Sequence, residues 1–150
     1  MAFLTEADFN TVIRQYQLDA ITGGDETIVP TAIEIALDEV TSIFTPNDMN
    51  EWKDGRPIYD IAADLAKDGD DRNATLLAHA KIITLWHLVL LCNTGLVYEE
   101  VKDRYDRSIV MLEDIASGKK NSATMTKVVA PEPDDEIPFQ MGGRTKFNHE

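Results

Sequence analysis

A nearly continuous apolar run between Asn73 and Cys92 constrains the fold more than any other part of the sequence. A membrane-spanning helix needs about 20 mostly uncharged residues. Here Lys81 and two histidines interrupt the run, and a lysine near the centre of a bilayer costs roughly 3 kcal/mol on insertion scales. A helix that is apolar nearly all round is otherwise buried on several sides. The run therefore predicts a helix in the middle of a bundle or at a subunit interface, capped by Asn73, rather than a membrane span.

The two histidines of this helix, His79 and His87, lie about two turns apart. A metal site would need carboxylates or a third histidine converging on them, and no acidic residue falls inside the helix. We therefore expect both to be hydrogen-bonded histidines of the core or of an interface. Because histidine titrates near neutrality, they could make assembly sensitive to pH.

Three further helices are predicted around this apolar helix, each from apolar residues that recur every three or four positions. The first begins at Thr5, which can cap it, and ends before Gly23. The second begins at Pro30, and the last covers residues 97–117. The residues expected to face the core are Phe9, Val12, Ile13, Ile33, Ala36, Val40, Ile43, Val101, Tyr105, Ile109, Leu112 and Ala116. The sequence therefore predicts an all-α fold, a small bundle of about four helices.

The segment that leads into the apolar helix is less regular. A short helix is predicted over 61–65, and an acidic turn follows at 68–71, which invites a calcium interpretation. An EF-hand loop needs an oxygen ligand at its fifth position, a glycine at its sixth and a glutamate at its twelfth. Counting from Asp68 gives Arg72, Asn73 and His79 at those positions. A solvated turn before a helix is the better interpretation, and no metal site is predicted.

The last predicted helix carries its charges on the face opposite to the apolar stripe. Glu100 and Arg104 are four residues apart, as are Asp103 and Arg107. Such pairs stabilise a helix by a few tenths of a kcal/mol each. Gly118 is well suited to end the helix in a left-handed conformation.

The chain changes character after residue 120. Residues 121–150 contain three prolines, two adjacent glycines and an acidic cluster, without a helical period. We therefore divide the chain into a helical domain, 1–120, and an extended C-terminal arm, 121–150. The expected partner-binding residues of the arm are Phe139, Met141, Arg144, Lys146 and Phe147. Aromatic residues and methionine favour an arm that orders on a partner over a merely disordered terminus.

The net charge of −13 and the lack of sequence signatures exclude several functions. A strongly acidic chain repels phosphate backbones and anionic lipid surfaces, so neither a nucleic-acid grip nor a membrane partner is expected. No phosphate-binding glycine loop, nucleophile elbow or zinc-protease motif is present. The only cysteine, Cys92, lies in an apolar run where a thiolate is disfavoured. The sequence therefore predicts neither an enzyme nor a cofactor.

Several segments resemble the Mu-like phage head–tail joining family. The segments that carry the resemblance are Met1-Ala2-Phe3-Leu4-Thr5-Glu6-Ala7-Asp8-Phe9, Arg72-Asn73 with Trp86-His87-Leu88, Arg104-Tyr105-Asp106-Arg107-Ser108-Ile109 continuing to Ser117-Gly118-Lys119, and the tail Gly142-Gly143-Arg144-Thr145-Lys146-Phe147. Five residues of the central and closing segments are expected in the core or at the subunit interface: Trp86, His87, Arg104, Tyr105 and Arg107.

The resemblance implies a helical adaptor of the virion, assembled in the host cytoplasm, that forms a ring below the portal vertex. Such a ring is usually a dodecamer, and its partners would be the portal protein, a tail-completion or tail-terminator protein, and further copies of itself. DNA would pass through the ring without specific binding, since an acidic lumen does not hold a polyanion. The alternative is a small acidic cytoplasmic helical protein that binds and regulates a single partner.

Overall fold

The computed structural model describes residues 2–45, 57–92 and 98–128, and within these ranges it is helical with no strand. In chain order the elements are a 3-10 helix Glu6–Thr11, α1 Gln15–Thr22, α2 Ile28–Phe44, α3 Ile61–Leu65, a 3-10 turn Gly69–Asp71, α4 Ala74–Cys92 and α5 Tyr98–Ala116. The predicted all-α fold is confirmed, as is the short helix over 61–65. A single antiparallel bridge joins Tyr59 to Lys127.

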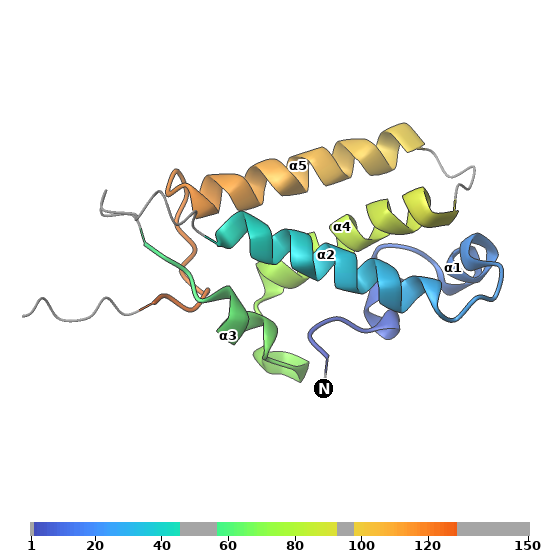
Figure 1. Cartoon of the computed structure of the whole chain (residues 1–150), viewed down its shortest axis with the longest axis horizontal. Coiled ribbons are helices and arrows are strands. Elements are labelled where there is room, and N and C mark those ends of the chain that lie inside the picture. The colour runs from blue at the N-terminus through green and yellow to red at the C-terminus, as the bar shows by residue number, and fades with distance from the viewer. Residues whose placement is uncertain (1, 46–56, 93–97, 129–150) are drawn as a thin grey trace, which may run out of the picture.

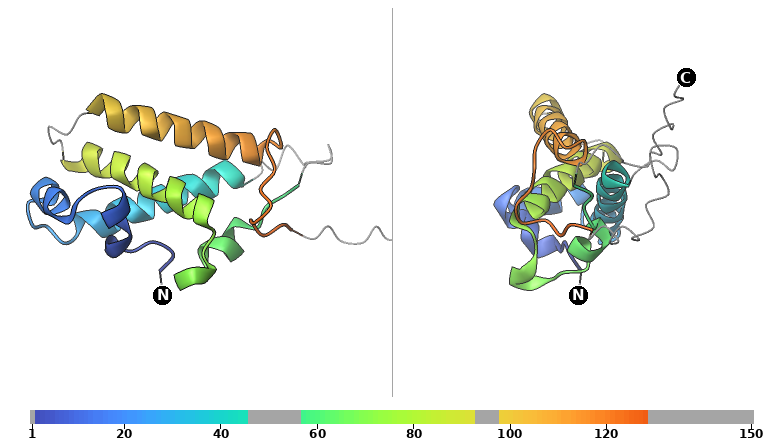
Figure 2. Two further views of the ribbon diagram at one scale, coloured as in Figure 1. Left: turned by 180° about the vertical axis from the view of Figure 1, so that it is seen from behind. Right: turned by 90° about the vertical axis from the view of Figure 1, so that its left-hand side faces the viewer.

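The three long helices α2, α4 and α5 pack against one another, and Figures 1 and 2 show them running along the longest axis of the molecule. α4 contacts α1 as well as the other two long helices. By length and apolar composition α4 would also pass as a membrane span. Its position in the bundle agrees with the predicted central helix, and its buried residues are Leu76, Ala80, Ile83, Thr84, Leu85, Trp86, Leu88 and Val89.

The N-cap of α4 is Asn73, as predicted. Its side-chain Oδ1 accepts the backbone N–H of Leu76 at 3.0 Å, which satisfies one of the free N–H groups of the first turn. The last helix, α5, ends just before Gly118, which adopts a φ of 81°, a left-handed conformation that glycine takes without strain.

The buried stripe of α2 agrees with the predicted one at its centre and differs from it at its ends. The buried residues are Val29, Ala32, Ala36, Val40 and Phe44, spaced by three or four. Ala36 and Val40 are buried as predicted, whereas Ile33 and Ile43, predicted at the two ends of the stripe, are only partly buried. Pro30 lies in the first turn, because the helix already begins at Ile28.

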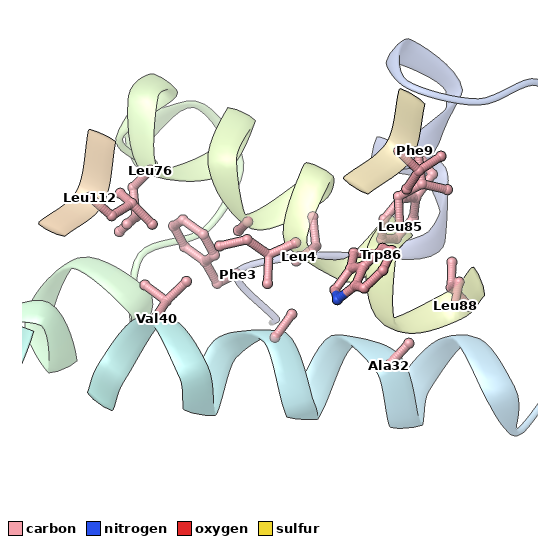
Figure 3. Packing of buried hydrophobic residues seen from close by; sticks show 14 of the residues in the cluster. Phe3, Leu4, Phe9, Ala32, Val40, Leu76, Leu85, Trp86, Leu88 and Leu112 are labelled. Carbon is pink, nitrogen blue, oxygen red and sulfur yellow. The ribbon is translucent and has the colours of Figure 1, made fainter. Parts of the chain in front are cut away.

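The core between the helices is filled by aliphatic and aromatic side chains from every part of the bundle, and Figure 3 shows ten of them by name. From the N-terminal segment, Phe3, Leu4 and Phe9 are at most 3 % exposed. From α5, Leu112 is fully buried, whereas Tyr105 and Ile109 are partly buried against the core. Leu90, in the last turn of α4, is half exposed.

Candidate functional site

A polar cluster joins the three long helices through Glu39 of α2, His87 of α4 and Tyr105 of α5. The Nε2 atom of His87 lies 2.7 Å from Oε2 of Glu39. The Tyr105 hydroxyl donates to the other carboxylate oxygen, Oε1. Each oxygen of Glu39 is therefore engaged by a different helix, and the three helices are held in one rotational register.

Aromatic rings extend this cluster toward the C-terminal end of α4. The Trp86 ring stacks on Tyr105 with centroids 5.3 Å apart, and Tyr98 approaches the same indole to 5.1 Å. His87 meets Tyr105 edge-on. Burial and the adjacent Glu39 carboxylate raise the pKa of Tyr105 to about 12, so its hydroxyl remains a donor at neutral pH. The arrangement is suited to fixing helix positions.

Of the predicted core or interface residues, the structure brings Trp86, His87 and Tyr105 together, but not the two arginines. Arg104 and Arg107 point outward from α5, with 47 % and 79 % of their side chains exposed. They pair with the residues four positions earlier, Glu100 and Asp103, as the sequence predicted. Both arginines therefore lie on the solvent-exposed face of α5.

The two histidines of α4 differ in their surroundings. His87 is hydrogen-bonded as predicted, and its partner is Glu39 of α2, a residue that the sequence did not single out. For His79 the prediction of a hydrogen bond is not met within the described residues, where its Nδ1 atom is buried without a partner. Burial lowers the pKa of His79, which favours the neutral imidazole in this position.

One end of the bundle exposes large apolar side chains, and we call it the open end. Leu90 and Leu91 in the last turn of α4 are 50 % and 48 % exposed, and Tyr98 in the first turn of α5 is 50 % exposed. The contact of Tyr98 with Trp86 brings the start of α5 beside the end of α4. Figure 1 shows α1 at this same end of the molecule. Three large apolar side chains at this end of the bundle thus leave part of their surface in water.

An acidic groove lies beside the open end. It has a volume of about 470 Å³, and its lining includes four carboxylates, Glu6, Asp19, Asp25 and Glu26, with no lysine or arginine. Residues of α1 line part of the groove, and Figure 1 shows α1 at the same end of the molecule as the C-terminus of α4. Burial and the charge of Asp25 together raise the pKa of the Cys92 thiol. The predicted inert thiol agrees with this direction. The groove and the exposed apolar residues thus lie toward the same end of the molecule.

The opposite end is closed by residues 121–128, which we call the arm root. The carboxylate of Asp64, a fully buried residue, accepts the backbone N–H of Thr126 at 2.9 Å and its hydroxyl at 2.7 Å. The ammonium group of Lys67 lies 2.6 Å from the same carboxylate. Burial alone would raise the pKa of Asp64, but these bonds lower it. Met125 is only 5 % exposed.

The arm root corrects the predicted domain boundary at residue 120. Thr124 accepts a hydrogen bond from the Asn73 side chain at 2.7 Å, and the Tyr59 hydroxyl accepts the backbone N–H of Ser122. Within the described part of this segment, the backbone pairing of Lys127 is a single bridge to Tyr59. Residues 121–128 therefore belong to the packed domain, because polar partners far away in the sequence hold them there.

The acidic turn at Gly69–Asp71 is bound by the side chain of the next residue, Arg72. This guanidinium donates from Nε to the Gly69 carbonyl and from its two Nη atoms to both oxygens of Asp8, at 2.9 and 3.2 Å. It also binds the Phe3 carbonyl. In the described residues no group of three or more His, Cys, Asp or Glu side chains is arranged to hold a metal ion. Arg72 thus ties the N-terminal segment to the start of α4.

The predicted arm residues Phe139, Met141, Arg144, Lys146 and Phe147 lie outside the described residues. Comparison of the whole chain with protein-family models, with curated proteins and with solved structures finds no match.

Proposed function

We propose that this chain is a structural head–tail connector subunit of a tailed phage, which forms a ring below the portal. The observation that carries the proposal is the open end, where Leu90, Leu91 and Tyr98 are each about half exposed. Three large apolar side chains at one end of a small bundle favour contact with another protein, since their exposure lowers solubility without stabilising the fold.

The charge of the chain supports the same proposal. With a net charge of −13, copies arranged around a channel would present an acidic lumen, through which DNA passes without being held. The sequence segments that resemble the Mu-like head–tail joining family give the proposal its specific form. The portal protein and a tail-completion or tail-terminator protein would be the partners above and below the ring.

The first test of this function is assembly of the purified full-length chain. We expect a closed ring in negative-stain micrographs and a mass that is a fixed multiple of the 16.8 kDa subunit, either alone or after addition of the portal protein. A stable one-to-one complex with a single unrelated protein, without a ring, would contradict the proposal and favour the small regulatory protein.

A second test concerns the channel and the virion. We expect no duplex DNA binding at physiological salt, because no phosphate grip is proposed; a gel shift at micromolar protein that weakens with added salt would oppose the acidic lumen. In a phage that lacks the subunit, we expect filled heads without tails, and restoration of infectious particles by the intact chain.

A further inference from the structure

We infer that the distal arm of one copy, residues 137–147, binds the open end and the acidic groove of the next copy, so that subunits join head to tail. This inference deepens the proposed function and rests on it, because it assumes that copies of the chain assemble with one another. It assigns a definite occupant to the exposed apolar surface and a definite surface to the arm residues.

The arm leaves the described part of the chain at the closed end of the molecule. The last described residue, Val128, is held at the closed end by its backbone N–H, which donates to the Ile58 carbonyl at 2.8 Å. The open end lies at the other extreme of the helices, as Figure 1 shows, and α5 between them has 19 residues, about 28 Å at 1.5 Å per residue. The arm therefore starts at the end of the molecule opposite to its proposed binding surface.

The second argument is the length of chain after Val128. Phe139 follows it by 139 − 128 = 11 residues and Phe147 by 147 − 128 = 19 residues. At about 3.3 Å per residue, an extended chain places Phe139 up to roughly 36 Å and Phe147 up to roughly 63 Å from Val128. Both lengths are sufficient to reach the end of an adjacent copy. An arm that bound its own open end would have to reverse direction and run back along the bundle. An adjacent copy placed end to end needs no reversal.

The third argument is chemical complementarity. The open end offers Leu90, Leu91 and Tyr98 as exposed apolar contacts, and the distal arm offers Phe139, Met141 and Phe147. Buried aromatic side chains commonly dominate the energy of such interfaces.

Charge complementarity follows the same division. The acidic residues of the arm all precede residue 137, apart from the final Glu150, and the distal part carries only the positive charges of Arg144 and Lys146. The groove beside the open end is lined by four carboxylates without a basic residue. The basic residues of the distal arm are thus complementary in charge to this acidic surface.

An arm at one end and its receptor at the other form a heterologous contact, since the two surfaces differ. Repetition of a heterologous contact closes into a ring when the rotation between copies permits, and otherwise continues as a filament. The proposed contact thereby supplies the geometry that a connector ring needs.

The experiment is cysteine cross-linking in the full-length chain, with Cys92→Ser to remove the native thiol. One population carries Leu91→Cys and an affinity tag, and the other carries Gln140→Cys, adjacent to two of the arm contacts. The two are mixed, treated with a short bismaleimide, and separated by mass. We expect a covalent pair that contains one chain of each population. A matched control replaces Leu91→Cys with Val110→Cys, an equally exposed apolar position on α5, and should give at least about tenfold less product.

Each outcome bears on the inference. Loss of the covalent pair by more than about tenfold on adding Phe139→Ser and Phe147→Ser would support the arm contact. A third chain carries both Leu91→Cys and Gln140→Cys. If it cross-links only within one molecule, and the two single-cysteine populations give no mixed pair, binding by a second copy is overturned. Rings without any cross-link would overturn the arm contact and leave the connector function standing. If the mixed covalent pair forms but the protein assembles only into dimers, the arm contact is supported and the ring is contradicted.

Discussion

The two ends of the bundle are built in opposite ways. At the closed end, polar groups far apart in sequence satisfy one another: Asp64 binds Thr126, and the Asn73 side chain, which also caps α4, binds Thr124. At the open end, Leu90 and Tyr98 leave about half of their apolar surface in water. In the part of the chain that the structure describes, hydrogen bonds between distant residues tie the closed end together, whereas large apolar side chains stay half exposed at the open end.

This difference indicates that the two ends contribute differently to the stability of the fold and to interaction with other molecules. Hydrogen bonds to a fully buried carboxylate are costly to break, because the remaining partner is left unsatisfied. An exposed leucine contributes little to the fold and can be changed at small cost. The closed end should therefore control unfolding, and the open end should control assembly.

The largest expected effect comes from removing the arm root. A chain cut after Lys120 loses buried Met125 and leaves Asp64 without its Thr126 partner, so we expect a loss of about 3 to 6 kcal/mol in unfolding free energy. The melting temperature should fall by roughly 10 °C or more. A chain cut after Val128 is the matched control and should melt as the full chain does. Equal melting of the two truncated chains would show that the closed end does not depend on the arm root.

The same substitution at two leucines compares the interior with the open end. Leu112→Ala opens a cavity at a fully buried site and should cost about 2 to 5 kcal/mol. Leu90→Ala, at a half-exposed site, should cost less than about 1 kcal/mol. Both are measured by urea denaturation of the purified chains. Similar losses for the two leucines would remove the distinction between them.

Acid should weaken the contacts of Asp8 with Arg72, which precedes the start of α4. Burial alone would raise the pKa of Asp8, but its bonds with Arg72 and Thr5 lower it to about 2. A lowered pKa stabilises the fold above the unfolded value near 3.8, and this contribution disappears as pH falls from about 5 to about 2. We expect a loss of about 1 to 2 kcal/mol for this carboxylate.

The control for the acid effect is Asp8→Asn, which cannot titrate. Its unfolding free energy should be lower at neutral pH and should change less between pH 5 and pH 3 than that of the unmodified chain. An unchanged pH dependence in this variant would show that Asp8 is not responsible.

The smallest effect on stability is expected at the open end itself. Leu91→Ser should change the unfolding free energy by no more than about 0.5 kcal/mol, because half of the side chain already lies in water. The same substitution should weaken self-association in light-scattering measurements. Val110→Ser, at a comparably exposed site on α5, should change neither quantity, and a variant of Leu91 that assembles normally would speak against the open end as an interface.

Prediction from the sequence succeeded where one local rule was sufficient. The apolar run from Asn73, its cap, the ion pairs of α5 and the short α3 all follow from periodicity or from residues three or four positions apart. It failed where the partner was distant. The bond of Glu39 to His87 joins residues 48 positions apart, and that of Asp64 to Thr126 joins residues 62 apart. No spacing rule relates such positions.

The sequence by itself determined the all-α class, the central helix and the outward charges of α5, since each depends on neighbours along the chain. Only the tertiary structure decided that the arm root belongs to the domain and that Leu90 is exposed while Leu88 is fully buried. In a helix as apolar as α4, composition does not distinguish the buried face from the exposed one. The neighbouring helices make that distinction, because the side chains they cover lose water and the remainder keep it.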